Sequence, residues 1–150
     1  MADIEQLLVP MDGSPLSERA LRIALSEYQQ ATVTVLHVID PTKPGYSYPV
    51  ETDPYNEPLH GSEEWYERSR ELAEQLFEDV HDVAAEYEAD VTTETAVGEP
   101  GRAIVDYVDH HDVDQIVIGS HGRDEDTSSM LGSVTETVVF RSPVRVLLVR

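Results

Sequence analysis

Short apolar runs rich in β-branched residues recur along the chain and alternate with longer stretches in which apolar residues keep a helical spacing. Runs of this kind are typical of buried parallel strands. We expect five strands, at residues 4–9, 32–39, 91–97, 115–118 and 144–149. The helical stretches predict helices that begin near Ser14, Ser62, Pro100 and Ser133. Strands that alternate with helices predict an α/β fold with an open sheet and right-handed crossovers.

Capping signals mark two of these helix starts. Ser14 is predicted to cap the first helix, with Pro15 at its first position. Ser62 is predicted to open the longest helix, whose apolar stripe is expected to pack in the core. The stripe comprises Trp65, Leu72, Leu76, Val80, Ala84 and Tyr87. The third strand alternates only weakly and is expected to be more exposed than the first two.

Residues 40–61 form the least regular part of the chain, because five prolines forbid a continuous helix there. We interpret this segment as a surface excursion with packed tyrosines; a lid over a ligand site is the alternative. His37, near the end of the second strand, is interpreted as a residue with a local hydrogen-bond partner.

The fourth predicted strand leads into glycines spaced Gly-x2-Gly-x9-Gly-Ser, at Gly119, Gly122, Gly132 and Ser133. Glycine permits positive φ and lets a ligand approach the backbone closely. Ser133 is predicted to cap the following helix, whose free N–H groups and dipole favour an anion. The pattern therefore predicts a phosphate cradle; two ordinary turns and a helix cap are the alternative.

In this spacing the chain resembles the ATP-binding branch of the universal stress protein family, and Gly-Ser-Val-Thr-Glu from Gly132 onward strengthens the resemblance. The resemblance covers nearly the whole chain and implies a single domain over residues 1–150. The implied fold is a Rossmann-like, five-stranded parallel sheet of order 3-2-1-4-5 with helices on both faces. Strands one and four would flank the topological switch point, where open α/β sheets bind ligands.

The resemblance also implies an adenine-nucleotide site. The segment Val-Pro-x-Asp-Gly-Ser at residues 9–14 would lie against the nucleotide, with Asp12 bonded to the ribose. An Asx turn is the local structural role of Asp12. The backbone around Val38 would meet the adenine. The predicted ligand is ATP, with AMP or ADP as alternatives and Mg²⁺ or Mn²⁺ as accompanying ions. The predicted nucleotide-binding residues are Pro10, Asp12, Val38, Gly119, Ser120, His121, Gly122, Arg123, Gly132, Ser133 and Val134.

The charge of the chain indicates the salt conditions in which the protein folds. The chain has 30 acidic and 10 basic residues, a formal net charge of −20. Self-repulsion on this scale opposes compaction in dilute buffer, whereas molar salt shortens the Debye length to about 3 Å. We therefore expect a halophilic source. The lack of a basic patch argues against a nucleic-acid partner.

The loop after Gly122 departs from the family pattern. Residues 124–126 are three consecutive acids, which would repel a triphosphate unless they point away, bind a cation or are screened by salt. Arg123 is the only nearby cation and is predicted to reach a phosphate.

Other function classes are disfavoured. The chain lacks cysteine, which excludes disulfides and thiol chemistry. No apolar segment is long enough for a membrane span and the start lacks a basic signal region, so a cytoplasmic protein without a membrane partner is expected. Adjacent His110 and His111 point in different directions on a helix, so no metal site is predicted.

Catalysis is weakly signalled. Ser120, His121 and Asp124 lie on one short loop without a nucleophile elbow, and the Gly-Lys pair of a Walker loop is missing. A nucleotide-responsive binding module is therefore the leading hypothesis. A slow ATPase or self-phosphorylating enzyme at the same site, and a dimeric scaffold that does not bind nucleotide, are the alternatives.

The last predicted strand, at residues 144–149, is apolar on both faces. At a sheet edge such a strand needs a cover, and pairing with its twin across a two-fold axis would give a homodimer. The family resemblance implies the same interface. A fully covered position inside a monomer is the alternative, and no protein partner is predicted.

Overall fold

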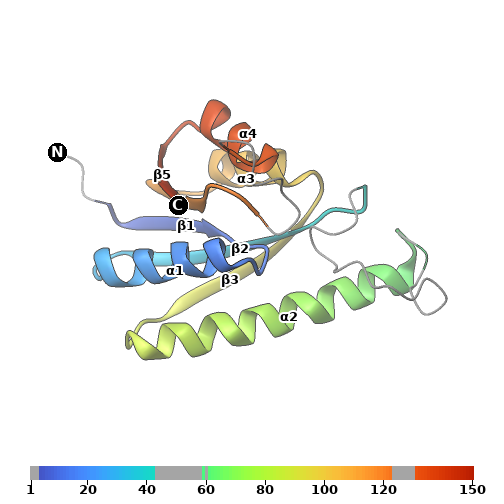
Figure 1. The fold of residues 1–150 in the computed structure, drawn as a ribbon, viewed down its shortest axis with the longest axis horizontal. Helices are drawn as coiled ribbons and strands as arrows, with labels where there is room; N and C mark the ends of the chain where they lie inside the picture. Colours follow the sequence, from blue (N-terminus) through green and yellow to red (C-terminus); the bar gives the residue numbers. More distant parts are fainter. Residues whose placement is uncertain (1–3, 43–58, 60, 123–130) are drawn as a thin grey trace.

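The computed structural model describes residues 4–42, 59, 61–122 and 131–150. Its five strands are β1 (Gln6–Pro10), β2 (Thr32–Ile39), β3 (Val91–Val97), β4 (Gln115–Gly119) and β5 (Arg145–Val149). They form one parallel sheet in the order β3-β2-β1-β4-β5 (Figure 1). The predicted fold class and strand order are confirmed, and β5 lies at the sheet edge.

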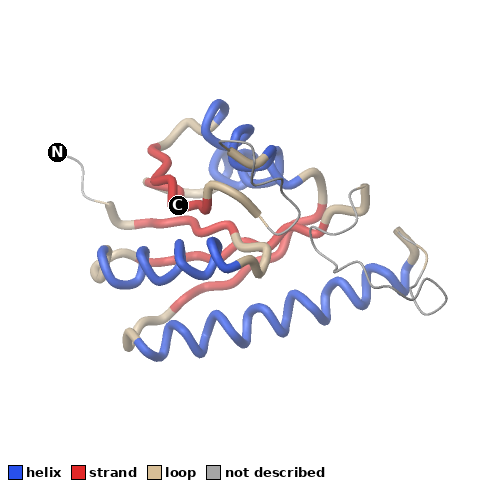
Figure 2. Tube along the Cα trace, in the orientation of Figure 1, coloured by secondary structure: helices blue, strands red, loops and turns tan. Residues whose placement is uncertain are grey.

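Helices cover both faces of this sheet. The helices are α1 (Pro15–Glu27), α2 (Glu63–Glu86), α3 (Pro100–His110) and α4 (Ser133–Arg141). In Figure 2, α1 and α2 lie on one side of the strands, and α3 and α4 lie on the other. Successive strand residues point to opposite faces, so Leu7 packs under α1 and α2 while Leu8 packs under α3 and α4.

The strands do not all end at the same level of the sheet, and this difference creates the candidate site described below. The last residue of β1, Pro10, pairs with Leu36 of β2. β2 then continues to Ile39, where it pairs only with Val97 of β3. On its other side, β1 pairs with β4 through Leu8 and Ile116. The chain leaves the sheet in opposite directions after β1 and β4, which makes their carboxyl ends the switch point.

Two helix caps are as predicted. Ser14 Oγ accepts a hydrogen bond from the Ser17 N–H at 3.3 Å, and Ser62 Oγ accepts one from the Trp65 N–H at 3.2 Å. Pro15 is the first residue of α1. These bonds satisfy N–H groups that have no partner inside the helix.

The predicted cap at Ser133 is wrong. Gly132 is the N-cap of α4, with φ −68° and ψ 161°, and it supplies no side-chain hydrogen bond. The Gly132 carbonyl already accepts from the Glu136 N–H at 2.8 Å, so Ser133 is the first helical residue. A bond from the Gly132 N–H to the Ser120 carbonyl at 2.8 Å fixes the chain at this point, and the helix starts one residue earlier than the serine suggested.

The apolar stripe of α2 packs in the core as predicted. Trp65, Val80 and Ala84 are buried, and Leu72, Leu76 and Tyr87 pack partly buried against the same clusters. In β3 only Val91 is buried, and the other residues are half-buried or exposed, so β3 is more exposed than β1 and β2. In the part of the chain that the structure describes, no helix is long and apolar enough to cross a membrane. The excursion predicted at residues 40–61 lies mostly outside the described residues, which include only residues 40–42, 59 and 61 of it, so its packed tyrosines stay a prediction.

Candidate functional site

The turn after β1 forms one wall of the candidate site. The Met11 N–H donates to the Leu36 carbonyl at 2.9 Å, which extends the β1–β2 ladder by one residue. Asp12 then leaves the sheet, and its carboxylate accepts from the Ser14 N–H at 2.9 Å. This is the predicted Asx turn. Asp12 is only 6% exposed, so a carboxylate is held at the carboxyl end of the sheet in a fixed orientation.

His37 supports this turn from the neighbouring strand. The Nδ1 of the buried His37 ring lies 2.8 Å from the Met11 carbonyl oxygen, so Nδ1 carries the proton in this hydrogen bond. The prediction of a local partner is confirmed. The contact ties β2 to the residue that precedes Asp12.

Gly119 ends β4 and has a packing role that the sequence did not reveal. A Cβ added to Gly119 would lie 2.9 Å from the Leu16 Cβ and 3.3 Å from the Leu16 carbonyl carbon. Among the described glycines, positive φ occurs at Gly13, Gly61 and Gly98 and not at Gly119. Gly119 therefore does not use the positive φ open to glycine, and its missing side chain lets α1 approach β4. Close approach of a ligand to its backbone stays a prediction.

The first turn of α4 is anchored over the end of β4. Thr135 Oγ1 donates to the Gly119 carbonyl at 2.7 Å, and this threonine is buried. The Gly132 N–H donates to the Ser120 carbonyl on the same stretch. The two bonds hold the helix N-terminus, with the positive end of its dipole, beside the switch point.

These three pieces of chain share one cleft. Its walls are formed by Pro10, Asp12, Ser14, Ser17, Ile118, Gly119, His121, Gly122, Val134 and Thr135. The enclosed space is about 30 Å³, close to the share of volume that one water molecule takes in the liquid. The described residues therefore form the inner wall of a site, and a larger ligand would lie along its open side.

Val38 does not line this cleft. Only its backbone groups, and not its side chain, point toward the side on which the cleft lies. Its side chain is buried in the core under α3. The Leu36 carbonyl faces Met11, and the Ile39 carbonyl faces Gly98 after β3. Backbone groups of successive strand residues alternate in direction, so the N–H and C=O of Val38 face the side where β1 has already ended.

The remaining predicted residues fall in different places. Pro10, Asp12, Gly119, His121, Gly122 and Val134 line the cleft. Ser120 is buried behind it, with its Oγ 3.2 Å from His121 Nδ1, and Gly132 and Ser133 form the start of α4. Arg123 and the acids at residues 124–126 lie outside the described residues.

Sequence reasoning missed two polar cleft residues, Ser17 and Thr135. Ser14 was expected to lie against the nucleotide as part of residues 9–14, but it was not named as a binding residue. Ser17 and Thr135 sit in the first turns of α1 and α4, where a hydroxyl reaches backbone groups of the preceding loop, and that position was the available signal. Among the described residues, no group of three or more His, Asp or Glu side chains could hold a metal ion.

The comparisons with known proteins agree with this geometry. The family model described as the universal stress protein family matches residues 4–150. The universal stress protein YxiE of Bacillus subtilis is 32% identical over 97% of this chain and 98% of its own length. The structure of UspA from Lactobacillus plantarum is 26% identical, with a TM-score of 0.76 and full coverage of both chains.

A second similar structure is that of a complex with a ligand. The universal stress protein from Archaeoglobus fulgidus in complex with dAMP covers all of both chains, with a TM-score of 0.64 and 22% identity. At this identity the likeness concerns the fold alone. From the match over residues 4–150 and the relative at 32% identity, this chain belongs to the universal stress protein family.

Proposed function

We propose that this chain binds an adenine nucleotide, with ATP as the principal ligand, along the cleft between the end of β1 and the start of α4. The observation that carries the proposal is that three features suited to a nucleotide lie together in one cleft. A buried carboxylate (Asp12), a glycine-containing turn (Gly119 to Gly122) and an anchored helix N-terminus meet at the switch point of the sheet. Open α/β sheets bind ligands at such points.

The phosphates would lie at the N-terminus of α4. The first N–H groups of a helix and its dipole favour an anion. Gly122 and Gly132 bring backbone without side chains to this end of the cleft, and Val134 closes it. His121 lines the same wall and can donate a hydrogen bond to an anion from whichever ring nitrogen is protonated. Mg²⁺ or Mn²⁺ would accompany ATP as counter-ions of its phosphates.

The nucleoside would lie over the end of β1. The Asp12 carboxylate keeps acceptor capacity beyond its bond to Ser14 and suits the hydroxyls of a ribose. The outward backbone N–H and C=O of Val38 suit the donor and acceptor edge of adenine. The dAMP complex of the Archaeoglobus fulgidus protein supports an adenine nucleotide as the ligand class on this fold.

The biological role that we infer is a dimeric, nucleotide-responsive module of the stress response. The free edge of β5 supports the dimer. Because the Val149 carbonyl faces β4, where it accepts from the Ser120 N–H, the backbone groups of Val146 and Leu148 point away from the sheet. A second copy of the strand would pair with them.

Nucleotide content is the first test of the binding proposal. The protein is purified in molar KCl and denatured, and any released molecule is identified by chromatography and mass. The emptied protein is then titrated with ATP, AMP and GTP at high and low salt. Co-purified adenine nucleotide, or tighter titration by ATP than by GTP, is expected. Folded protein that binds no nucleotide at high salt would overturn the proposal and favour the scaffold.

Gly122→Val tests the cradle directly. A branched side chain on the cleft wall would displace the phosphates from the backbone, so we expect ATP affinity to fall at least about tenfold, equivalent to about 1.4 kcal/mol. Asp12→Asn is the companion variant, because its amide oxygen can still accept from Ser14 while the charge is removed. Unchanged affinity in Gly122→Val would remove Gly122 from the site.

The same purified protein separates binding from catalysis. Phosphate release and transfer of labelled γ-phosphate to the protein are followed at saturating ATP with Mg²⁺ or Mn²⁺. Binding without turnover supports the module. Turnover that is lost in Gly122→Val would instead identify a slow ATPase or self-phosphorylating enzyme at this cleft.

A further inference from the structure

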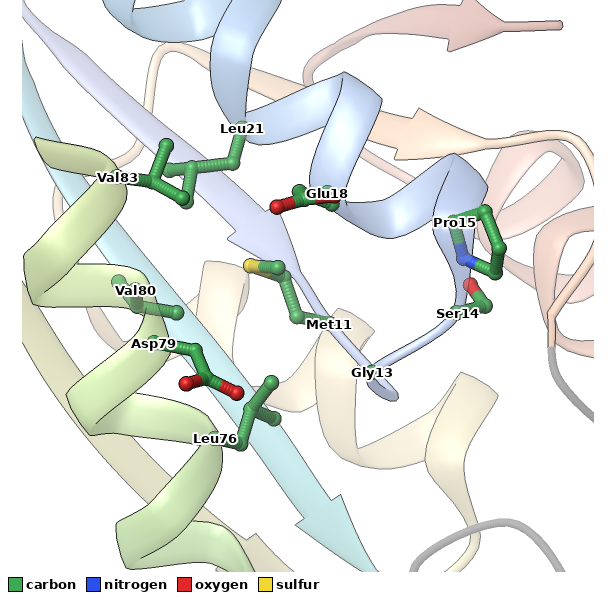
Figure 3. A pocket seen from close by; sticks show the side chains of 10 residues that line it. All are labelled: Met11, Gly13, Ser14, Pro15, Glu18, Leu21, Leu76, Asp79, Val80 and Val83. Carbon is green, nitrogen blue, oxygen red and sulfur yellow. The ribbon is translucent and has the colours of Figure 1, made fainter. Parts of the chain in front are cut away.

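A larger hollow lies on the other side of the turn after β1, between α1 and α2 (Figure 3). Its volume is about 240 Å³. Side chains from α1, α2 and the turn surround it, and the nucleotide cleft described above lies beyond the turn. The lining residues are Met11, Gly13, Ser14, Pro15, Glu18, Leu21, Leu76, Asp79, Val80 and Val83.

The floor of the hollow is apolar and rigidly held. Met11, Leu21, Val80 and Val83 belong to the buried core cluster under α1 and α2, and Leu76 packs partly buried against it. Four of these five side chains are therefore fixed by packing on the far side. Those four are each at most 6% exposed, so a ligand in the hollow would cover mainly the more exposed Leu76 and Pro15.

Two carboxylates stand over this floor, one from each helix. Glu18 projects from α1 and Asp79 from α2, and Figure 3 shows both carboxylates beside the opening. Glu18 lies 3.5 Å from the Arg22 guanidinium, but Arg22 makes its shorter contact, 2.7 Å, with Glu86. Glu18 is thus only partly neutralised. Asp79 takes part in none of the ion pairs found among the described residues.

The combination selects a ligand class. Two negative charges over an apolar floor repel phosphates and carboxylates, and among the described residues they fall short of the three side-chain ligands of a metal site. An organic cation satisfies both features, because its apolar body covers the floor while its charged nitrogen meets the carboxylates. We propose that the hollow between α1 and α2 binds a small organic ammonium ion with an apolar body. This hollow adjoins the nucleotide cleft and shares Ser14 with it, but its other lining residues differ and the proposal does not rest on nucleotide binding.

The net charge of −20 supplies the competing explanation, since a strongly acidic surface attracts any cation diffusely. Local binding differs from diffuse attraction in two respects. It needs the apolar body as well as the charge, and it depends on Asp79 more than on a neighbouring acid. Asp82 is exposed on the same helix and does not line the hollow, which makes it the matched control.

The test uses phenethylammonium as the probe. Its comparison compounds are phenylethanol, which lacks the charge, and methylammonium, which has only a methyl group as its apolar part. Affinity is measured by calorimetry at about 0.15 M and about 1 M KCl. Chemical shifts of the Leu76 and Val80 methyl groups report the location. We expect phenethylammonium to bind more tightly than either comparison compound and to shift these methyl groups. Equal binding of phenylethanol and phenethylammonium would overturn the proposal.

The variants locate the charge. Asp79→Asn is expected to weaken binding about twofold to fivefold, the range of an exposed ion pair. Glu18→Gln is expected to weaken it less, because Arg22 shares that carboxylate. Asp82→Asn is expected to change affinity less than twofold, within about 0.4 kcal/mol. Equal losses in Asp79→Asn and Asp82→Asn, or shifts of the Val134 methyl groups in place of those of Leu76, would overturn the proposal. All three acids are exposed, so melting curves should confirm folded variants.

Discussion

Tyr107 is the described residue whose chemistry the fold changes most clearly. It lies on α3 against the sheet, where burial and, to a smaller extent, the nearby Glu94 carboxylate together raise the pKa of its phenol to about 12. The His111 ring stacks on it with centroids 3.8 Å apart and planes 8° from parallel. A phenolate at this position would lose hydration and face a carboxylate.

Alkaline titration tests this environment. The folded protein holds the Tyr107 proton to higher pH than the unfolded chain, whose tyrosine titrates near pH 10. The stabilisation is therefore complete below about pH 10 and is lost as pH rises through about 12. The tyrosinate absorbance of wild type minus that of Tyr107→Phe should show a component centred near pH 12. A component centred near pH 10 would contradict this account.

At the scale of elements, the site depends on how α4 is attached to β4. The Thr135 hydroxyl bonds to the Gly119 carbonyl inside the protein, whereas the hydroxyl of the half-buried Thr137 bonds to the Ser133 carbonyl within the same helix. The first bond joins two elements and the second does not. This difference allows a matched comparison on one helix.

Thr135→Val should destabilise the protein by about 1–3 kcal/mol, because it leaves the buried Gly119 carbonyl without this donor while keeping the side-chain shape. It should also weaken ATP binding, since the N-terminus of α4 loses its anchor. Thr137→Val should cost less than about 0.5 kcal/mol. Urea unfolding and ATP titration measure both effects. Equal destabilisation by the two variants would show that the bond to Gly119 does not position α4.

The edge strand β5 is the second element with a testable role. Val146→Asp should weaken a dimer that pairs through β5, because it places a charge in the strand and against its twin. Val97→Asp is the control, since Val97 lies on β3 at the opposite edge and is 51% exposed. Light scattering at molar KCl should report monomers only for Val146→Asp, with melting curves as a check on folding. A dimer that survives would place the interface on another surface.

At the scale of the whole molecule, charge dominates. The chain has only 10 basic residues against 30 acidic ones. The three ion pairs found among the described residues all involve exposed side chains. Screening such pairs removes little stability. Screening the excess negative charge removes a larger, long-range repulsion.

The melting temperature should therefore rise between about 0.1 M and about 1 M KCl. A variant with neutralised acids on the exposed side of α2, at Glu71→Gln, Glu74→Gln, Glu78→Gln and Asp82→Asn, should rise less. Differential scanning calorimetry measures both. A melting temperature that falls with salt would contradict the repulsion argument. The expected halophilic source and cytoplasmic location stay predictions.

The sequence by itself determined the elements and their order. Apolar runs marked each strand to within about two residues at its ends, because a strand covered on both faces must be apolar throughout. Ser14 and Ser62 marked helix starts, because an N-cap bond forms between residues only three apart. The sheet order came from the family resemblance, and it is confirmed.

The tertiary structure alone decided the roles that depend on residues far apart in the chain. Gly119 reads as a ligand-loop glycine, yet its missing side chain makes room for Leu16. Gly101, in the first turn of α3, lets α3 pack against α4, because a Cβ at this position would lie 2.7 Å from the Thr137 Cβ. Ser133 reads as a cap, yet the bond between Gly132 and Ser120 sets the helix start.

The same reason explains the two cavities. Local pattern reports which residues prefer a strand, a cap or a turn, because these preferences act over a few neighbours. The wall that joins Asp12 to Thr135, and the hollow that joins Glu18 to Asp79, arise only when the sheet brings separate helices together. Sequence therefore determined which elements form and which chemistry they carry, and packing decided which of those groups face one another.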